Sequence, residues 1–264
     1  MRLKIAHRTE YHYETPPDYG LQRIRLTPQE RSTQRVHSWN IAIEGAREEV
    51  RYIDSFGNET RLLSMDSGEH ALAIEASGEV DTKDTSGVAG NQRGFAPLWL
   101  FSQTTPLTAP GPRLSALAEG IKDGEDIDRL HRLMAAVADG IAYTVGATEA
   151  TTTAEEALTL GAGVCQDHTH AFTAVARLLG FPTRYVSGYL MHRGERELAA
   201  SHAWAEVHVA NLGWVGFDAA NRVSPDDAYV ALAVGRDYRD AAPVSGILLG
   251  QASERLAVRI TVEQ

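Results

Sequence analysis

The sequence predicts an α+β protein in two parts, a β-sandwich over residues 1–105 followed by an α+β domain over residues 106–264. Three observations predict this organisation. The first part alternates polar and apolar residues in short runs and has almost no helical periodicity. Thr105-Pro106 and Ala109–Pro112 then punctuate the chain. Beyond them, helical patterns come first and antiparallel strands follow.

The first part is predicted to contain six short strands, and Ile5–Tyr13 and Val36–Ile43 among them alternate with period two. The six strands are Ile5–Tyr13, Arg23–Thr27, Val36–Ile43, Val50–Asp54, Glu59–Ser64 and His70–Val80. Gly57-Asn58 lies between the fourth and fifth runs and predicts a hairpin turn. Polar residues scatter over this part without forming a cluster, so we expect it to be a scaffold.

Three helices are predicted next, at Arg113–Lys122, Ile127–Ala142 and from Thr153 to Leu160. The second has an apolar stripe that consists of Ile127, Leu130, Leu133, Met134, Val137 and Ile141. The third opens on Thr153-Ala-Glu-Glu156, which is typical of a capping box.

A fourth helix is predicted to begin at Cys165, the only cysteine in the chain. The positions at helical spacing from it are Thr169, Phe172, Ala176 and Leu179, so the thiol lies at the start of the buried face. A helix N-terminus favours the thiolate, and Gly161 and Gly163 let the backbone turn just before it. These features suit a nucleophile, although a cysteine taken alone is more often a small core residue.

Strands are predicted at Thr183–Met191, His202–Ala210, Trp214–Asp218 and Leu256–Val262. His202 heads one strand, and Asp218 ends the next one after a tight turn. In an antiparallel hairpin the Asp218 carboxylate can reach the imidazole, fix its tautomer and stabilise the imidazolium. We therefore predict a catalytic site of Cys165, His202 and Asp218. Trp204 and Trp214 are expected to pack behind it, with lining of the cleft as the alternative for Trp204, which shares a strand face with His202.

The pattern Cys165-x-x-His168-x-His170 also suggests a zinc site. Helical spacing argues against it, because His170 points away from Cys165 and is expected to lie toward solvent. We expect no bound metal. His168 and Asp167 are expected to shape the cleft beside the thiol.

Composition limits the partners. Of 264 residues, 25 are basic and 35 acidic, which gives a net charge of −10 and argues against nucleic-acid or anionic-membrane binding. The N-terminal residues alternate and do not read as a signal peptide, and no apolar run is long enough to span a bilayer. With one cysteine, the expected compartment is the cytoplasm.

Two segments, Gly161–Tyr189 and Ser201–Asn221, resemble the transglutaminase-like (papain-like thiol) superfamily. That family has a glycine-preceded Cys that opens a helix, a His-Ala-Trp strand and a Gly-Trp-x-x-Phe-Asp strand. Asp54–Asn58, Gly235–Tyr238 and Ala242–Gly246 resemble its bacterial branch, which has an N-terminal β-domain. The resemblance covers nearly the whole chain and implies a transglutaminase-like catalytic domain whose helix-borne Cys packs on an antiparallel sheet.

By the same resemblance, Cys165 is the nucleophile, His202 the general base and acid, and Asp218 the orienting carboxylate, with no cofactor. The family commonly continues the aspartate as Asp-Pro-Thr, whereas Asp218 is followed by Ala219-Ala220-Asn221. We therefore expect the turn after Asp218 to be looser or differently shaped.

The implied reaction is thiol-dependent acyl transfer on a protein or peptide substrate. Hydrolysis of a peptide or amide bond is the expected outcome, because water is always present whereas an amine acceptor needs its own site. Protein-glutamine transamidation on the same triad and a non-catalytic interaction module are the alternatives.

The backbone N–H of Cys165 is the expected first oxyanion donor. The sequence does not identify the second, for which Trp99 and Gln103 are candidates. Arg236-Asp237-Tyr238 is either a substrate rim or an ordinary ion pair beside a half-buried tyrosine.

Overall fold

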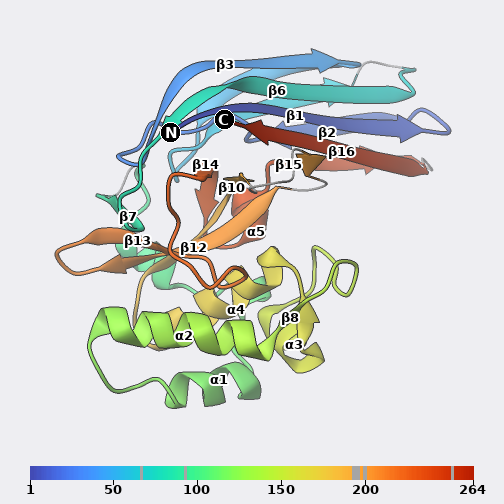
Figure 1. Ribbon diagram of the computed structural model, residues 1–264. Coiled ribbons are helices and arrows are strands. Elements are labelled where there is room, and N and C mark those ends of the chain that lie inside the picture. The colour runs from blue at the N-terminus through green and yellow to red at the C-terminus, as the bar shows by residue number, and fades with distance from the viewer. Residues whose placement is uncertain (66–67, 92–93, 192–196, 199–200, 251–252) are drawn as a thin grey trace.

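The computed structural model describes residues 1–65, 68–91, 94–191, 197–198, 201–250 and 253–264. Long strands form one end of the molecule, helices form the other, and a third sheet lies between them (Figure 1). The strands of the first part are β1 (Arg2–Tyr13), β2 (Tyr19–Ile24), β3 (Gln34–Glu44), β4 (Ala46–Ile53), β5 (Glu59–Met65), β6 (Ala71–Thr82) and β7 (Val88–Gly90).

Two sheets make up the strand-rich end. The first has the order β11-β16-β1-β6-β3, and the second has the order β15-β2-β5-β4. Alternation along β1 buries Leu3 and Ile5, which pack with Leu63 of β5 and Leu72 of β6 in one apolar core. The predicted β-sandwich is therefore present, and β4 and β5 form the hairpin predicted at Gly57-Asn58.

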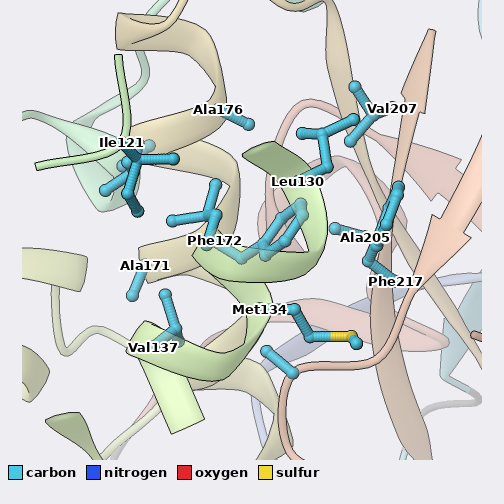
Figure 2. Close-up of a cluster of buried hydrophobic side chains, with 14 of the residues drawn as sticks. Ile121, Leu130, Met134, Val137, Ala171, Phe172, Ala176, Ala205, Val207 and Phe217 are labelled. Carbon is cyan, nitrogen blue, oxygen red and sulfur yellow. The ribbon is translucent and has the colours of Figure 1, made fainter. Parts of the chain in front are cut away.

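Most of the helices lie at the other end of the molecule, and the short last one lies beside the third sheet (Figure 1). Two short 3-10 helices, η1 (Leu98–Ser102) and η2 (Pro106–Thr108), precede α1 (Pro112–Glu119), α2 (Asp126–Gly140), α3 (Ala154–Leu160), α4 (Cys165–Leu178) and α5 (Tyr238–Ala241). The predicted stripe of α2 packs onto α4, where Leu130, Met134 and Val137 meet Phe172 (Figure 2). The predicted capping box opens α3, because the Thr153 hydroxyl accepts from the Glu156 N–H.

The third sheet packs against α4 and has the order β14-β10-β12-β13-β7. The remaining strands are β8 (Ala142–Tyr143), β9 (Ala162–Gly163), β10 (Thr183–Leu190), β11 (Glu197–Leu198), β12 (His202–Val209), β13 (Gly213–Phe217), β14 (Tyr229–Gly235), β15 (Val244–Leu249) and β16 (Glu254–Glu263). Within the third sheet, the antiparallel hairpin β12–β13 turns at Asn211, which has a positive φ of 66°. The helix-borne cysteine thus lies over an antiparallel sheet, as predicted.

The predicted division at residues 105 and 106 stays a prediction, and strand pairing crosses it in both directions. From the first part, β7 pairs with β13 of the third sheet. From the second part, β15 pairs with β2, and β16 pairs with β1 along ten residues. The predicted strand Leu256–Val262 therefore exists as part of β16, but it completes the sandwich. Since β16 is the last strand, this pairing also brings the two ends of the chain side by side (Figure 1).

Within the described ranges, no helix is both long and apolar enough to cross a membrane. The predicted cytoplasmic location stays a prediction.

Candidate active site

Cys165 is the first residue of α4, and its thiol is buried. As the first helical residue, it has no intrahelical acceptor for its backbone N–H, which therefore points out of the helix end. Two glycines shape the backbone that leads into α4. Gly161 ends α3 with a left-handed φ of 71°, and a Cβ on Gly163 would come within 2.7 Å of the Asp167 carboxylate. The predicted sharp turn before the cysteine is present for these reasons.

Asp167 and His168 hold the backbone around this helix start. Asp167 Oδ2 accepts from the Val164 N–H at 2.8 Å and from the Thr148 hydroxyl at 2.6 Å. The His168 ring lies between two carbonyl oxygens, with Nδ1 2.9 Å from Val164 O and Nε2 2.8 Å from Ile141 O. Both side chains are buried and contact the backbone of Val164, so they stabilise the turn that precedes Cys165.

His202 and Asp218 meet as the register of their hairpin predicts. β12 pairs with β13 through Ala205 and Phe217, which brings the end of β13 next to the start of β12. His202 Nε2 lies 2.6 Å from Asp218 Oδ2, and the side chains are 10% and 1% exposed, respectively. Because Nε2 faces the carboxylate, Nδ1 is the ring atom left for the thiol of Cys165, which helps to raise the pKa of the imidazole.

Opposing effects set the charge of this pair. Burial by itself would lower the pKa of His202, but its hydrogen bonds to Asp218 and Cys165 and the charges of both raise that pKa to about 10. Burial would likewise raise the pKa of Asp218, but its hydrogen bonds and the charge of His202 lower it. The surroundings therefore favour the imidazolium form of His202 beside an ionised Asp218 at neutral pH.

Further side chains at the site were not predicted from the sequence. Asn221 Nδ2 and the Tyr229 hydroxyl each donate to Asp218 Oδ2 at 2.8 Å. The Asn221 N–H also donates to Asp218 Oδ1 at 3.2 Å, and the Asp218 backbone pairs with Val223 in both directions. The turn after Asp218, which we expected to be looser or differently shaped, is closed by several hydrogen bonds.

Tyr143 on β8 is another residue that the sequence did not indicate. Partial burial and then the charges of Cys165 and Asp218 raise its pKa. Its side chain is 57% exposed, and its ring stacks on His168 at 6.1 Å.

The expectation that His170 lies toward solvent is wrong. His170 is fully buried, because α4 packs against other elements on almost every side. Its Nε2 accepts from the Tyr238 N–H at 3.1 Å, and burial, followed by the charges of Arg177 and Arg239, lowers its pKa to about 3. Among the residues described, no group of three or more His, Cys, Asp or Glu side chains is arranged to hold a metal ion.

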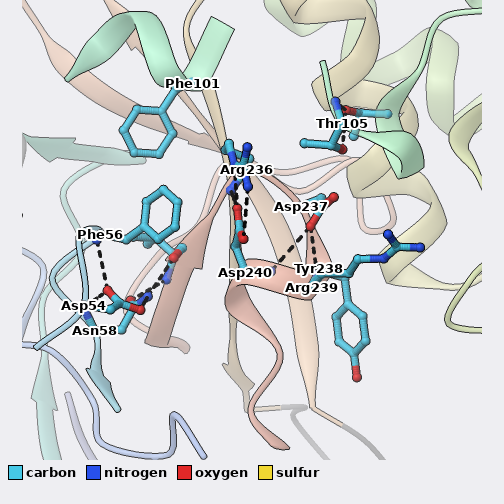
Figure 3. Close-up of polar contacts among 12 residues, drawn as sticks. Asp54, Phe56, Asn58, Phe101, Thr105, Arg236, Asp237, Tyr238, Arg239 and Asp240 are labelled. Atoms are coloured by element: carbon cyan, nitrogen blue, oxygen red, sulfur yellow. Dashed lines mark hydrogen bonds and ion pairs between the residues drawn. The ribbon is translucent and has the colours of Figure 1, made fainter. Parts of the chain in front are cut away.

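The other predicted side chains have defined positions. Trp204 and Trp214 are buried, and Trp204 stacks on His202 at 6.3 Å. Arg236 pairs with Asp240 at 2.7 Å, while Asp237 caps α5 (Figure 3). The Tyr238 ring packs against the cluster that contains Cys165.

The two candidates for a second oxyanion donor lie at η1. Trp99 is 64% exposed, and Gln103 Nε2 donates to the Trp99 carbonyl at 3.5 Å. Their role at the site stays a prediction.

The chain is similar to known families and proteins along most of its length. Residues 115–219 match the model of the transglutaminase-like superfamily, and residues 3–81 match that of the bacterial transglutaminase-like N-terminal region. An uncharacterized protein of Mycobacterium leprae is 29% identical over 275 residues, which cover 99% of this chain and 98% of the relative. One from Mycobacterium tuberculosis is 27% identical over 289 residues, which cover 99% and 92%.

Among solved structures, the chain is similar to one from Cytophaga hutchinsonii described as "a Putative Cysteine Protease". The TM-score is 0.77 at 20% identity, over 100% of this chain and 91% of the other. At that identity the likeness concerns the fold.

Proposed function

We propose that the chain is a thiol enzyme for acyl transfer, because it carries a transglutaminase-like superfamily core over residues 115–219. A bacterial transglutaminase-like N-terminal region over residues 3–81 precedes this core. Cys165 is the nucleophile, His202 the general base and acid, and Asp218 the orienting carboxylate. One observation carries the proposal. His202 Nε2 lies 2.6 Å from Asp218 Oδ2, which leaves Nδ1 for the Cys165 thiol, and both neighbours raise the pKa of the imidazole.

The first half-reaction forms a thioester. The Cys165 thiolate attacks the carbonyl carbon of an amide, a C–S bond forms, and the carbonyl oxygen becomes an oxyanion that accepts from the backbone N–H of Cys165. Nδ1 of the His202 imidazolium then gives its proton to the leaving nitrogen as the C–N bond breaks. The amine leaves, and the acyl group stays on sulfur.

The second half-reaction releases the acyl group. Neutral His202 takes a proton from water, the hydroxide attacks the thioester carbonyl, and the C–S bond breaks to give a carboxylic acid and the thiolate. Asp218 stabilises the imidazolium each time it forms. We propose hydrolysis as the main outcome, since water needs no binding site of its own, whereas transamidation needs a bound amine at the same step.

The substrate that we propose is a protein or peptide, because its amide bonds provide the carbonyl that the thiolate attacks. We further propose the cytoplasm as its compartment, because a chain with a single cysteine has no intramolecular disulfide of the kind that extracellular proteins use.

The test is the pH dependence of Cys165 alkylation by iodoacetamide. Cys165 is the only thiol, so the signal has one source. We expect fast alkylation that persists well below the ordinary thiol pKa of about 8.5, because the imidazolium is present at every pH below about 10. His202→Ala is expected to slow alkylation at pH 6 by about 10-fold or more, because the thiolate loses its partner charge.

His208→Ala is the matched control, since His208 lies on the same strand and contacts Trp214 instead of the thiol. An alkylation profile that has the ordinary midpoint and is the same in all three proteins would refute the proposal and favour a non-catalytic module. Peptide-amide cleavage with and without an added primary amine then separates hydrolysis from transamidation. Cys165→Ala must abolish both.

A further inference from the structure

Within the part of the chain that the structure describes, three side-chain donors converge on one oxygen of the Asp218 carboxylate. Oδ2 accepts from His202 Nε2 at 2.6 Å, from Asn221 Nδ2 at 2.8 Å and from the Tyr229 hydroxyl at 2.8 Å. The Asp218 residue is 0% exposed and Tyr229 is 7% exposed. A buried carboxylate needs such donors, and hydrogen bonds to a charged group are stronger than those between neutral groups.

Tyr229 is held firmly in this position. It is the first residue of β14 and pairs with Leu190 of β10. Its ring contacts the Trp204 ring edge-on at 5.4 Å and the His202 ring at 5.9 Å. Burial and then the charge of Asp218 raise the pKa of Tyr229, so the phenol stays protonated and acts as a donor.

Two residues further along β14, the side chain of Gln34 anchors the strand to the sandwich. Gln34 Nε2 donates to Ala231 O at 2.8 Å, and the Ala231 N–H donates to Gln34 Oε1 at 2.7 Å. The position of the Tyr229 hydroxyl therefore depends on the N-terminal part as well as on the third sheet.

We propose that Tyr229 is a positioning residue whose hydroxyl fixes Oδ2 of Asp218 against the imidazole of His202. The inference rests on the proposed function, because it concerns the same triad. Asn221 Nδ2 also lies 3.4 Å from His202 Nε2, and both atoms are donors when the imidazole is protonated. Asp218 Oδ2 must lie between these two nitrogens to accept from both. The Tyr229 hydroxyl, which comes from β14, fixes it there.

This arrangement predicts a specific effect of pH. The groups that face Asp218 are His202 from β12, Asn221 from the turn and Tyr229 from β14, with Tyr143 and Cys165 beyond them. Removing the phenol donor from the charged form raises the pKa of Asp218. As the pH falls, the Asp218 carboxylate is then protonated at a higher pH than in wild type. Its negative charge no longer stabilises the imidazolium, and the reactive form of the thiol is lost at that higher pH.

The experiment compares Tyr229→Phe with Tyr189→Phe by the pH profile of Cys165 alkylation. Tyr189 is a matched control, because its buried hydroxyl is also hydrogen-bonded at 2.8 Å, to His7 Nδ1. In Tyr229→Phe we expect the acid limb to move up by about half a pH unit or more, which is a roughly 3-fold slower reaction on that limb. Tyr189→Phe should leave the acid limb unchanged, and both variants keep the aromatic ring that packing requires.

Asn221→Ala is a second variant that leaves β14 intact, since Asn221 lies on an exposed turn, and it should shift the limb in the same direction. The inference is overturned if wild type shows an activated thiol and Tyr229→Phe matches it, or if Tyr189→Phe shifts as much. An ordinary thiol profile in wild type would instead refute the proposed function, and this inference with it. Because the wild-type profile by itself tests the proposed function, failure of that function and failure of the Tyr229 inference are distinguishable.

Discussion

Glu206 is a buried carboxylate whose two partners come from different parts of the chain. It accepts from Arg31 and from Arg184, each at 2.7 Å. The Arg184 guanidinium also lies over the Trp214 ring, 4.2 Å from its centroid. Burial would raise the pKa of Glu206, but the charges and hydrogen bonds of the two arginines lower it to about 2. The cluster therefore joins β12 of the third sheet to the segment before β3.

Glu206→Gln is expected to lower the free energy of unfolding by about 3–5 kcal/mol, because it leaves two buried guanidinium groups without a counter-charge. Urea unfolding at pH 7 measures this loss. Since the folded pKa of about 2 lies below the ordinary 4.5, the carboxylate stabilises fully above pH 4.5, and the difference from wild type should shrink as the pH falls toward 2. Glu10→Gln breaks an exposed pair with Arg8, where solvent screens the charges, and should cost far less stability than Glu206→Gln. Equal losses in the two variants would contradict the prediction.

Single residues were predictable where a short segment contains the whole pattern. Cys165, His202 and Asp218 lie together as their motifs suggested, although their catalytic role stays a prediction. Tyr229 could not be found this way, because it lies eleven residues beyond Asp218 and approaches it only through the pairing of β14 with β10. His170 was placed wrongly, since helical spacing tells which residues share a face and not how many faces are covered.

At the scale of elements, β14 is the edge strand of the third sheet, and two side-chain amides satisfy its backbone. Asn58 Nδ2 donates to Val234 O and the Val234 N–H donates to Asn58 Oδ1, both at 2.8 Å (Figure 3). Gln34 makes the equivalent pair with Ala231. Each amide takes the place of a residue on a neighbouring strand, so the edge is not open to pairing with another chain.

Asn58→Ala is expected to lower the free energy of unfolding by about 2–4 kcal/mol. The change leaves both buried backbone groups of Val234 without partners, and each costs about 1–3 kcal/mol. Thermal or urea unfolding measures the loss. The control is Asn40→Ala on β3, where the side chain is exposed, and it should change stability by less than about 0.5 kcal/mol. A loss for Asn58→Ala as small as that of the control would show that water replaces the amide.

Element prediction succeeded where the periodic run was long and isolated. The apolar stripe of α2 and the alternation of β1, β3 and β6 were read correctly. β14 was missed because its run Tyr229–Gly235 is apolar throughout and buried on both faces, so it has no period-two signal. The short strands β7 and β15 were missed because their pairing partners lie in other parts of the chain.

At the scale of the whole molecule, the two parts share strands and buried contacts. β16 lies between β11 and β1, where it buries Ile260 and Val262 in the sandwich core. That core also includes Tyr189 and Val230 from the third sheet. The sequence could predict β16 as a strand but not its partner, since alternation tells which face of a strand is buried and not which strand lies beside it.

These contacts predict that the chain unfolds as one unit and that neither part folds alone. Fragment 1–105 would lack β15 and β16, and fragment 106–264 would carry both without β1 and β2 to pair with. The second fragment would also lose Asn58, Gln34 and Arg31, which would leave the β14 edge and Glu206 without their partners. We expect no cooperative urea transition for either fragment by far-UV circular dichroism.

For the full chain we expect a single transition, with coincident midpoints for circular dichroism and for exposure of the Cys165 thiol. Cys165 reports on the helical part and the dichroism of the strands on the sandwich, so the two probes follow different parts of the fold. Two separated midpoints, or a fragment 106–264 that folds cooperatively and keeps a fast-reacting thiol at pH 6, would mean that the shared strands are dispensable. The N-terminal part would then be a separate domain beside a self-sufficient active site.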